Sequence, residues 1–139
     1  MSGKVVNTLV MCGDSRLRGV GDELIEEHIK SDPYRWMRPG GVLELLREKT
    51  CSPFICNIST GTNGCEKWNI FLMNHQDCKA YPKWFSGDPA VEKSSHISDL
   101  RKAREMIMAV FVKANIKMFF AKILPGTEDK FALEEIHPF

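Results

Sequence analysis

The sequence lacks the features that mark several large classes of protein. No apolar run approaches the roughly 18 residues that a membrane-spanning helix needs. The formal net charge is only +1, which argues against a nucleic-acid binder that works through a general basic field. The N-terminus lacks the charged, apolar and small-residue pattern of a secretory signal. We therefore expect a cytoplasmic protein with neither a membrane nor a nucleic acid as its partner.

The sequence also shows no repeat, low-complexity tract or linker, and 139 residues fit a single domain, 1–139. Its composition, 43% hydrophobic and 27% charged, is ordinary for a soluble globular protein. The cysteines number five, and disulfides are not expected in a reducing compartment. Thiols that cluster are then expected to bind a metal or to do chemistry, and the alternative for each is a small buried apolar side chain.

Apolar patterning predicts strands that alternate with helices. The expected strands are 4–12, 34–38, 68–73, 117–124 and 130–136, and the expected helices are one from about 22 to the Asp32-Pro33 pair, 42–47, 52–59 and 91–116. Residues 79–89 are expected to be irregular. This order predicts an α/β fold with a mostly parallel central β-sheet, flanking helices and a C-terminal antiparallel hairpin strand.

Three side chains with metal-ligand chemistry follow two of these strands. Cys12 stands at the end of the first strand, and His75 and Cys78 lie just past the third. Ligands in such sheets bind at the carboxyl ends of strands, so neighbouring strands would bring the three together although 63 positions separate Cys12 from His75. Two thiolates and an imidazole are a ligand set for catalytic zinc. We predict one zinc ion per chain at this place.

Asp14 and Arg16 add a second element beside Cys12. The Asp14 carboxylate would either become a fourth ligand and close the site or pair with Arg16 and leave the fourth position open. The structural alternative is a helix-entry cap for Asp14 with Arg16 as its salt-bridge partner. Asp77 is expected to form the turn between His75 and Cys78, or else to accept a hydrogen bond from a ligand.

The combined motifs resemble those of the β-class carbonic anhydrases over about residues 4–81. The resemblance rests on Cys12-x-Asp14-Ser15-Arg16, on Gly40-Gly41 and on His75-x-Asp77-Cys78, in that order along the chain.

This resemblance implies zinc held by Cys12, His75 and Cys78, with Asp14 and Arg16 as catalytic residues. The implied reaction is the reversible hydration of carbon dioxide to bicarbonate, by a zinc-bound water whose pKa falls towards ~7 and whose hydroxide Asp14 orients. The resemblance further implies a substrate pocket shaped by Gly40 and Gly41, and a homodimer or higher oligomer.

Other functions stay open. The same site could act on a related small electrophile, such as carbonyl sulfide or carbon disulfide. A catalytically silent, zinc-binding regulatory domain is the alternative from another class, and its support is the segment Met37-Arg38-Pro39, where the family usually has Arg-Asn-Ala. The spacing from Cys12 to Arg18 also matches a phosphatase loop, but Asp14 would face the phosphate there.

The remaining cysteines and histidines are expected to have ordinary roles. Cys51, Cys56 and Cys65 are predicted to be structural, with Cys65 as a less favoured fourth ligand. Among the histidines, His28 is expected on the inner face of its helix, and His96 and His137 in exposed positions.

Overall fold

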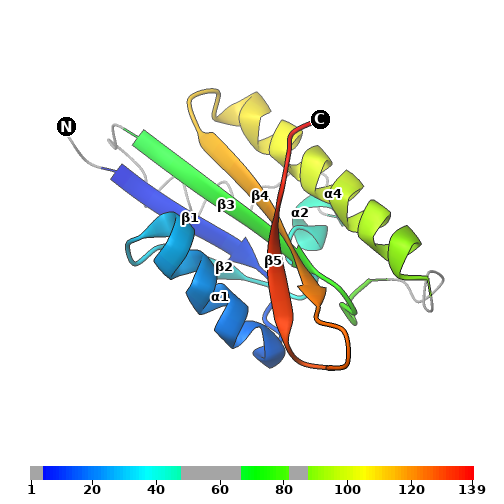
Figure 1. Ribbon diagram of the computed structural model, residues 1–139. Coiled ribbons are helices and arrows are strands. Elements are labelled where there is room, and N and C mark those ends of the chain that lie inside the picture. The colour runs from blue at the N-terminus through cyan, green and yellow to red at the C-terminus, as the bar shows by residue number, and fades with distance from the viewer. Residues whose placement is uncertain (1–4, 48–66, 82–87) are drawn as a thin grey trace.

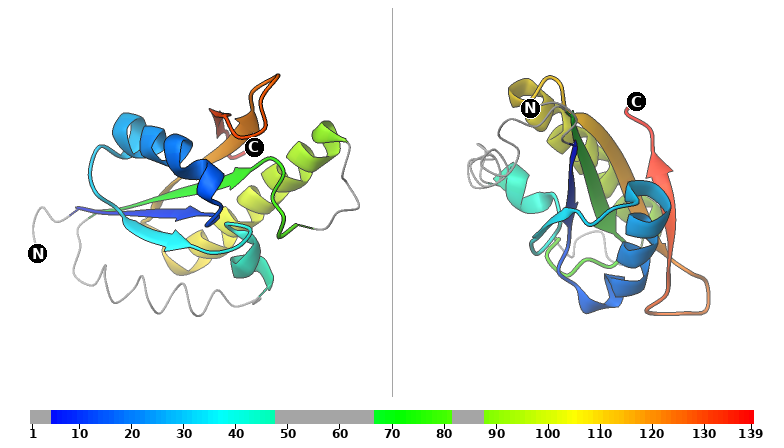
Figure 2. Two further views of the ribbon diagram at one scale, coloured as in Figure 1. Left: turned by 90° about the horizontal axis from the view of Figure 1, so that it is seen from below. Right: turned by 90° about the vertical axis from the view of Figure 1, so that its left-hand side faces the viewer.

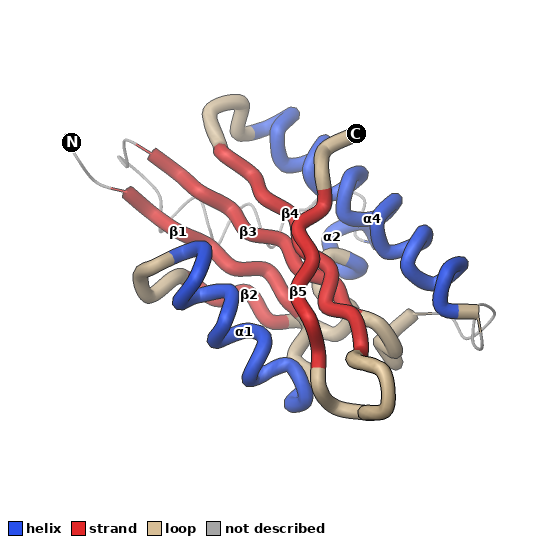
Figure 3. The backbone as a smooth tube through the Cα atoms, viewed as in Figure 1, coloured by secondary structure: helices blue, strands red, loops and turns tan. Residues whose placement is uncertain are grey.

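The computed structural model describes residues 5–47, 67–81 and 88–139. Five strands form one sheet in the order β2-β1-β3-β4-β5 (Figures 1 and 3). They are β1 (Val5–Met11), β2 (Tyr34–Met37), β3 (Lys67–His75), β4 (Asn115–Ile123) and β5 (Phe131–Ile136). The first four are parallel to their neighbours, and β5 returns antiparallel to β4. The predicted α/β fold, with its parallel sheet and final hairpin strand, is confirmed.

Helices cover both faces of the sheet. The helix α1 (Arg18–Leu24) is preceded by a 3-10 turn, η1 (Ser15–Leu17), and continues as a π-helical turn, η2 (Ile25–Ile29). It lies on one face, and α2 (Leu43–Arg47) and α4 (Pro89–Val110) lie on the other (Figure 2). No helix in the described part of the chain is long and apolar enough to cross a membrane.

The alternation of side chains along β1 explains the three layers. Val6 and Val10 pack in the cluster that includes Leu100 and Ile107 of α4, whereas Leu9 packs in the cluster that includes α1. Both faces of β1 are therefore buried, which is why its sequence is an almost continuous apolar run. Cys12, which directly follows this strand, is therefore attached to a strand that is packed on both faces.

Several predicted boundaries were wrong. The first helix begins at Arg18, before the expected start near residue 22, and it ends where Lys30 takes the left-handed conformation, φ 64°, before Asp32 is reached. The helix predicted over 91–116 begins at Pro89, where the Asp88 side chain caps it, and ends at Val110. Residues 111–114 form the turn into β4. The predicted helix 52–59 lies outside the described residues.

Candidate metal centre

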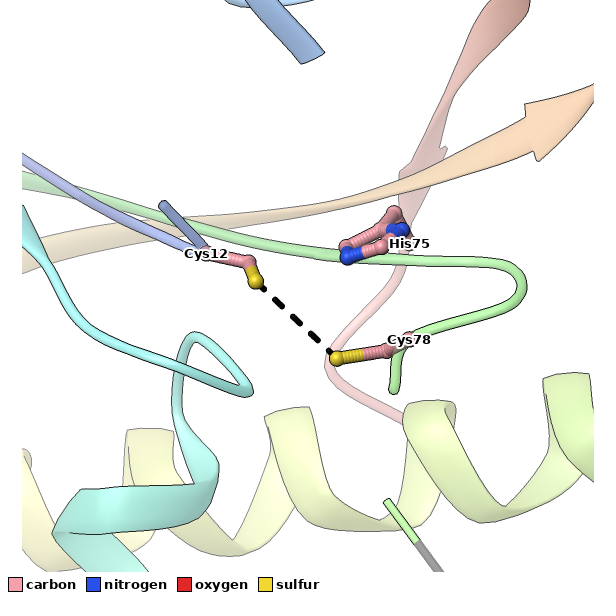
Figure 4. Close-up of side chains that lie close together, drawn as sticks. All are labelled: Cys12, His75 and Cys78. Atoms are coloured by element: carbon pink, nitrogen blue, oxygen red, sulfur yellow. Dashed lines mark hydrogen bonds between the residues drawn. The ribbon is translucent and has the colours of Figure 1, made fainter. Parts of the chain in front are cut away.

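Cys12, His75 and Cys78 lie together at the carboxyl ends of two neighbouring strands. Cys12 follows β1 directly, and His75 is the last residue of β3, which pairs in parallel with β1. One potential ligand atom from each residue lies within 4.8 Å of the other two, and all three residues are buried. Figure 4 shows the two thiols pointing toward each other, with the imidazole beside them. The predicted convergence is confirmed, and these residues form a group that could hold a metal ion.

The imidazole of His75 has one nitrogen committed and one available. Nδ1 lies 2.8 Å from the carbonyl oxygen of Gln76. Because a carbonyl oxygen only accepts, Nδ1 carries the proton and Nε2 has a free lone pair. Nε2 is buried and has no hydrogen-bond partner among the described residues. Metal-binding histidines commonly donate their other ring nitrogen to a carbonyl in this way, so the tautomer of His75 suits a metal ligand.

The sulfur atoms of the two cysteines lie 4.0 Å apart, in a hydrogen bond that either thiol could donate. The hydrogen bond with Cys78 lowers the pKa of Cys12, against burial, which raises it, and the backbone amides of Gly40 and Asp14 add to the lowering. The same hydrogen bond raises the pKa of Cys78 well above its usual range. The hydrogen bond between the two sulfurs therefore favours the loss of one of the two thiol protons.

This donor set fits zinc. Tetrahedral zinc with Zn–S bonds of about 2.3 Å places two sulfurs about 3.8 Å apart, close to the separation observed between the thiols. A divalent cation at this place would be held by the two sulfurs and by His75 Nε2.

Asp14 is held away from the ligand set by Arg16. Arg16 Nε lies 3.2 Å from each Asp14 carboxylate oxygen, and Nη2 lies 2.8 Å from Oδ2. Asp14 Oδ1 also accepts the Arg16 backbone N–H, capping η1. The hydrogen bonds from Arg16 lower the pKa of Asp14 to about 2. The carboxylate is therefore ionised and oriented, and the expected cap and ion pair both form.

Arg16 also reaches the second ligand-bearing segment, a contact that sequence reasoning missed. Its Nη1 pairs with Asp77 Oδ2 at 3.1 Å, and its Nη2 donates to the Asp77 carbonyl oxygen at 3.0 Å. Asp77 itself takes the left-handed conformation, φ 59°, so it does form the turn that was expected. One guanidinium thus links the segment after Cys12 to the turn before Cys78.

Gly41 packs against the end of β3 and close to the Cys12 amide nitrogen, and Gly40 packs against Leu43 and Ala80. Both have positive φ, +83° and +61°, and a Cβ on Gly41 would lie 2.7 Å from Asn74 Oδ1 and 2.9 Å from the Met73 carbonyl oxygen. This backbone approach requires glycine. A cavity of about 340 Å³ beside α1 is lined by Asp14 but by neither glycine. Their place in a substrate pocket stays a prediction.

The expectations for two histidines were reversed. His28 is exposed on η2, although its ring centroid lies 4.8 Å from that of Phe119. His96 is completely buried on α4, where it contacts Asn74 and Tyr81. The spacing of His96 from Leu100, Ala103 and Ile107 was the available signal, because it is the helical spacing of the buried face. His137 is exposed, as expected. Cys51, Cys56 and Cys65 lie outside the described residues.

Comparison of the chain with protein-family models, with curated proteins and with solved structures gave no match. The motif resemblance to β-class carbonic anhydrases accordingly remains an expectation. What the geometry establishes is a buried Cys-His-Cys group at the end of a parallel sheet, with an oriented carboxylate–guanidinium pair beside it.

Proposed function

We propose that this chain is a zinc-dependent enzyme that reversibly hydrates carbon dioxide to bicarbonate, as a β-class carbonic anhydrase does. The observation that carries the proposal is the convergence of Cys12, His75 and Cys78, whose ligand atoms lie within 4.8 Å of one another. Two sulfurs and one imidazole nitrogen are a known protein ligand set for catalytic zinc, which keeps its fourth position open.

Zinc in such a site supplies a nucleophile at neutral pH, because it acidifies the water that it binds. The buried position of the three ligands keeps bulk water from competing for them. The hydrogen bond from His75 Nδ1 to Gln76 fixes the plane of the imidazole, so Nε2 faces the site without reorganisation.

Asp14 would orient the nucleophile by accepting its hydrogen bond. Its pKa of about 2 keeps it ionised at neutral pH, and an ionised carboxylate is an acceptor only. Three N–H groups of Arg16 bond to the carboxylate, which has about four lone-pair sites, so one site is left to accept from the nucleophile. The pair therefore supports an open fourth position, since Asp14 bonded to Arg16 is not a ligand.

Stopped-flow measurement of carbon dioxide hydration, on zinc-replete protein at pH 7 and pH 9, tests the proposal. We expect a rate well above that of buffer, and Asp14→Ala should suppress it while zinc stays bound. Asp32→Ala is the matched control, because this exposed carboxylate pairs with Arg35 away from the ligands. Full activity in Asp14→Ala would remove the orienting role.

The same assay, extended to carbonyl sulfide and carbon disulfide, separates the alternatives. Turnover of either sulfur compound without carbon dioxide hydration would make the protein a hydrolase of related electrophiles. Zinc-replete protein that is inactive on all three would instead be a silent zinc-binding domain, and the proposal of catalysis would fail.

A further inference from the structure

The turn between His75 and Cys78 is held from the interior by a carboxylate. Glu92, in the first turn of α4, is largely buried, and its Oε2 accepts the backbone N–H of Asp77. Burial raises the pKa of Glu92, and the hydrogen bonds from the Asp77 and Cys78 backbone amides oppose that rise. A carboxylate is seldom buried without partners, and for Glu92 the partners are the backbone amides of the turn between His75 and Cys78.

A second buried side chain stands next to this carboxylate. His96 lies one helical turn after Glu92, and its Nε2 is 3.6 Å from Glu92 Oε2. The Asn74 side-chain amide faces the other ring nitrogen, with 3.0 Å between Nδ2 and Nδ1. Because the amide nitrogen only donates, His96 Nδ1 accepts and Nε2 carries the proton. Nε2 lies near Glu92 but beyond hydrogen-bond distance of its Oε2.

Asn74 carries the chain of contacts to the segment beside Cys12. Its Nδ2 also donates to the Tyr81 hydroxyl at 2.8 Å, and its Oδ1 accepts the Val42 backbone N–H at 3.3 Å. Val42 directly follows Gly41, whose backbone packs against Asn74 and close to the Cys12 amide nitrogen. Buried polar side chains thus connect both ligand-bearing segments to α4.

We propose that Glu92 is a positioning residue of the metal centre. Its carboxylate accepts the Asp77 N–H, and through this bond it holds Cys78 at the distance from Cys12 that a metal ion requires. His96 packs beside the carboxylate, with its Nε2 3.6 Å from Oε2. Arg16 also bonds to this turn, because it donates to the Asp77 side chain and to the Asp77 carbonyl oxygen. The inference rests on the proposed function only in taking zinc as the bound ion.

Zinc affinity, measured by competition with a chromophoric chelator on the full chain, tests this role. Glu92→Met keeps the length of the side chain but removes the acceptor, and we expect it to weaken zinc binding about 10–100-fold, as loss of an outer-sphere hydrogen bond typically does. Glu92→Gln keeps an acceptor oxygen and should restore most of the affinity. Glu105→Ala, an exposed carboxylate on the same helix, is the matched control and should bind zinc as the wild type does.

Substitution of cobalt(II) for zinc adds a second measurement, the visible absorption spectrum, which reports the geometry around the metal and not the stability of the fold. The visible absorption of the cobalt-loaded protein should change in Glu92→Met and return toward the wild-type spectrum in Glu92→Gln. Should Glu92→Met fail to fold, His96→Leu tests the same chain of contacts, with weaker zinc binding expected.

The two proposals fail differently. Wild-type protein that binds no zinc would overturn the metal site itself. Wild-type protein that binds zinc, with unchanged affinity and cobalt spectrum in Glu92→Met or in its replacement His96→Leu, would overturn the role of Glu92 and leave the metal site intact.

Discussion

Replacing Gly41 by alanine should destabilise the protein more than the same change at Gly126. Both glycines have positive φ, +61° and +79°, so each substitution costs about 1–2 kcal/mol for a left-handed residue that carries a Cβ. At Gly126 the Cβ would meet nothing within 4 Å. At Gly41 it would lie 2.7 Å from Asn74 Oδ1 and 2.9 Å from the Met73 carbonyl oxygen, so something must shift.

Overpacking of this kind typically costs about 1–3 kcal/mol in addition. Gly41→Ala should therefore lose about 2–5 kcal/mol, against about 1–2 kcal/mol for Gly126→Ala. Urea unfolding in zinc-replete buffer measures both, as a shift in midpoint at constant m-value. Because Asn74 lies between Gly41 and His96, Gly41→Ala should also weaken zinc binding. Equal destabilisation of the two variants would refute the close approach of Gly41 to the end of β3.

Three other changes give separate tests. Cys12→Ser should lose the metal and much of the zinc-dependent stability, because ligation is coupled to folding; unchanged metal content by elemental analysis would contradict this. Arg16→Met should lose about 1–2 kcal/mol at pH 7, discounted for the partial exposure of the pair. That loss should vanish as the pH falls from about 4 to 2, since the lowered pKa of Asp14 stabilises the fold only where Asp14 is ionised; a pH-independent loss would refute it. Burial lowers the pKa of His96 to about 3 in the folded protein, whereas its ordinary pKa is 6.5. Below pH 6.5 the imidazole therefore takes up a proton in the unfolded chain but not in the folded one. As the pH falls below 6.5, the free energy of unfolding of the wild type should therefore decrease by about 1.4 kcal/mol per pH unit more than that of His96→Gln. Urea unfolding at several pH values measures both, and the same pH dependence in the two proteins would contradict this.

The ligand set could be predicted because its signal is local and its geometry is general. Cys12 directly follows one strand with a clear apolar pattern and His75 ends another, and the carboxyl ends of parallel neighbours share one edge of the sheet. The sequence did not itself reveal that β1 and β3 are neighbours, so the convergence was predicted only on that condition, which the sheet order fulfils.

The contacts around the ligands could not be predicted, because they join segments far apart in the chain. Arg16 meets Asp77, 61 positions away, and Asn74 meets His96, 22 positions away. Polar residues follow no periodic pattern in the sequence that would predict which side chain each of them contacts. Such pairings follow only from how the layers pack.

Two helix boundaries failed for a different reason. The apolar spacing of α4 continues through Phe111 and Ala114, because these turn residues pack on the same core as the helix. Periodicity therefore does not mark the end at Val110. The first helix ends where Lys30 adopts the left-handed conformation. The residue in this conformation is usually glycine or asparagine, and because it is a lysine here, the sequence does not mark the end of the helix.

X-ray absorption at the zinc edge, on the zinc-loaded full chain, tests the central claim most directly. Ligation by Cys12, His75 and Cys78 predicts two sulfur scatterers at about 2.3 Å and one imidazole nitrogen at about 2.0 Å, with a light atom in the fourth position. A first shell of oxygen and nitrogen alone, or protein that retains no zinc after purification without chelator, would contradict it.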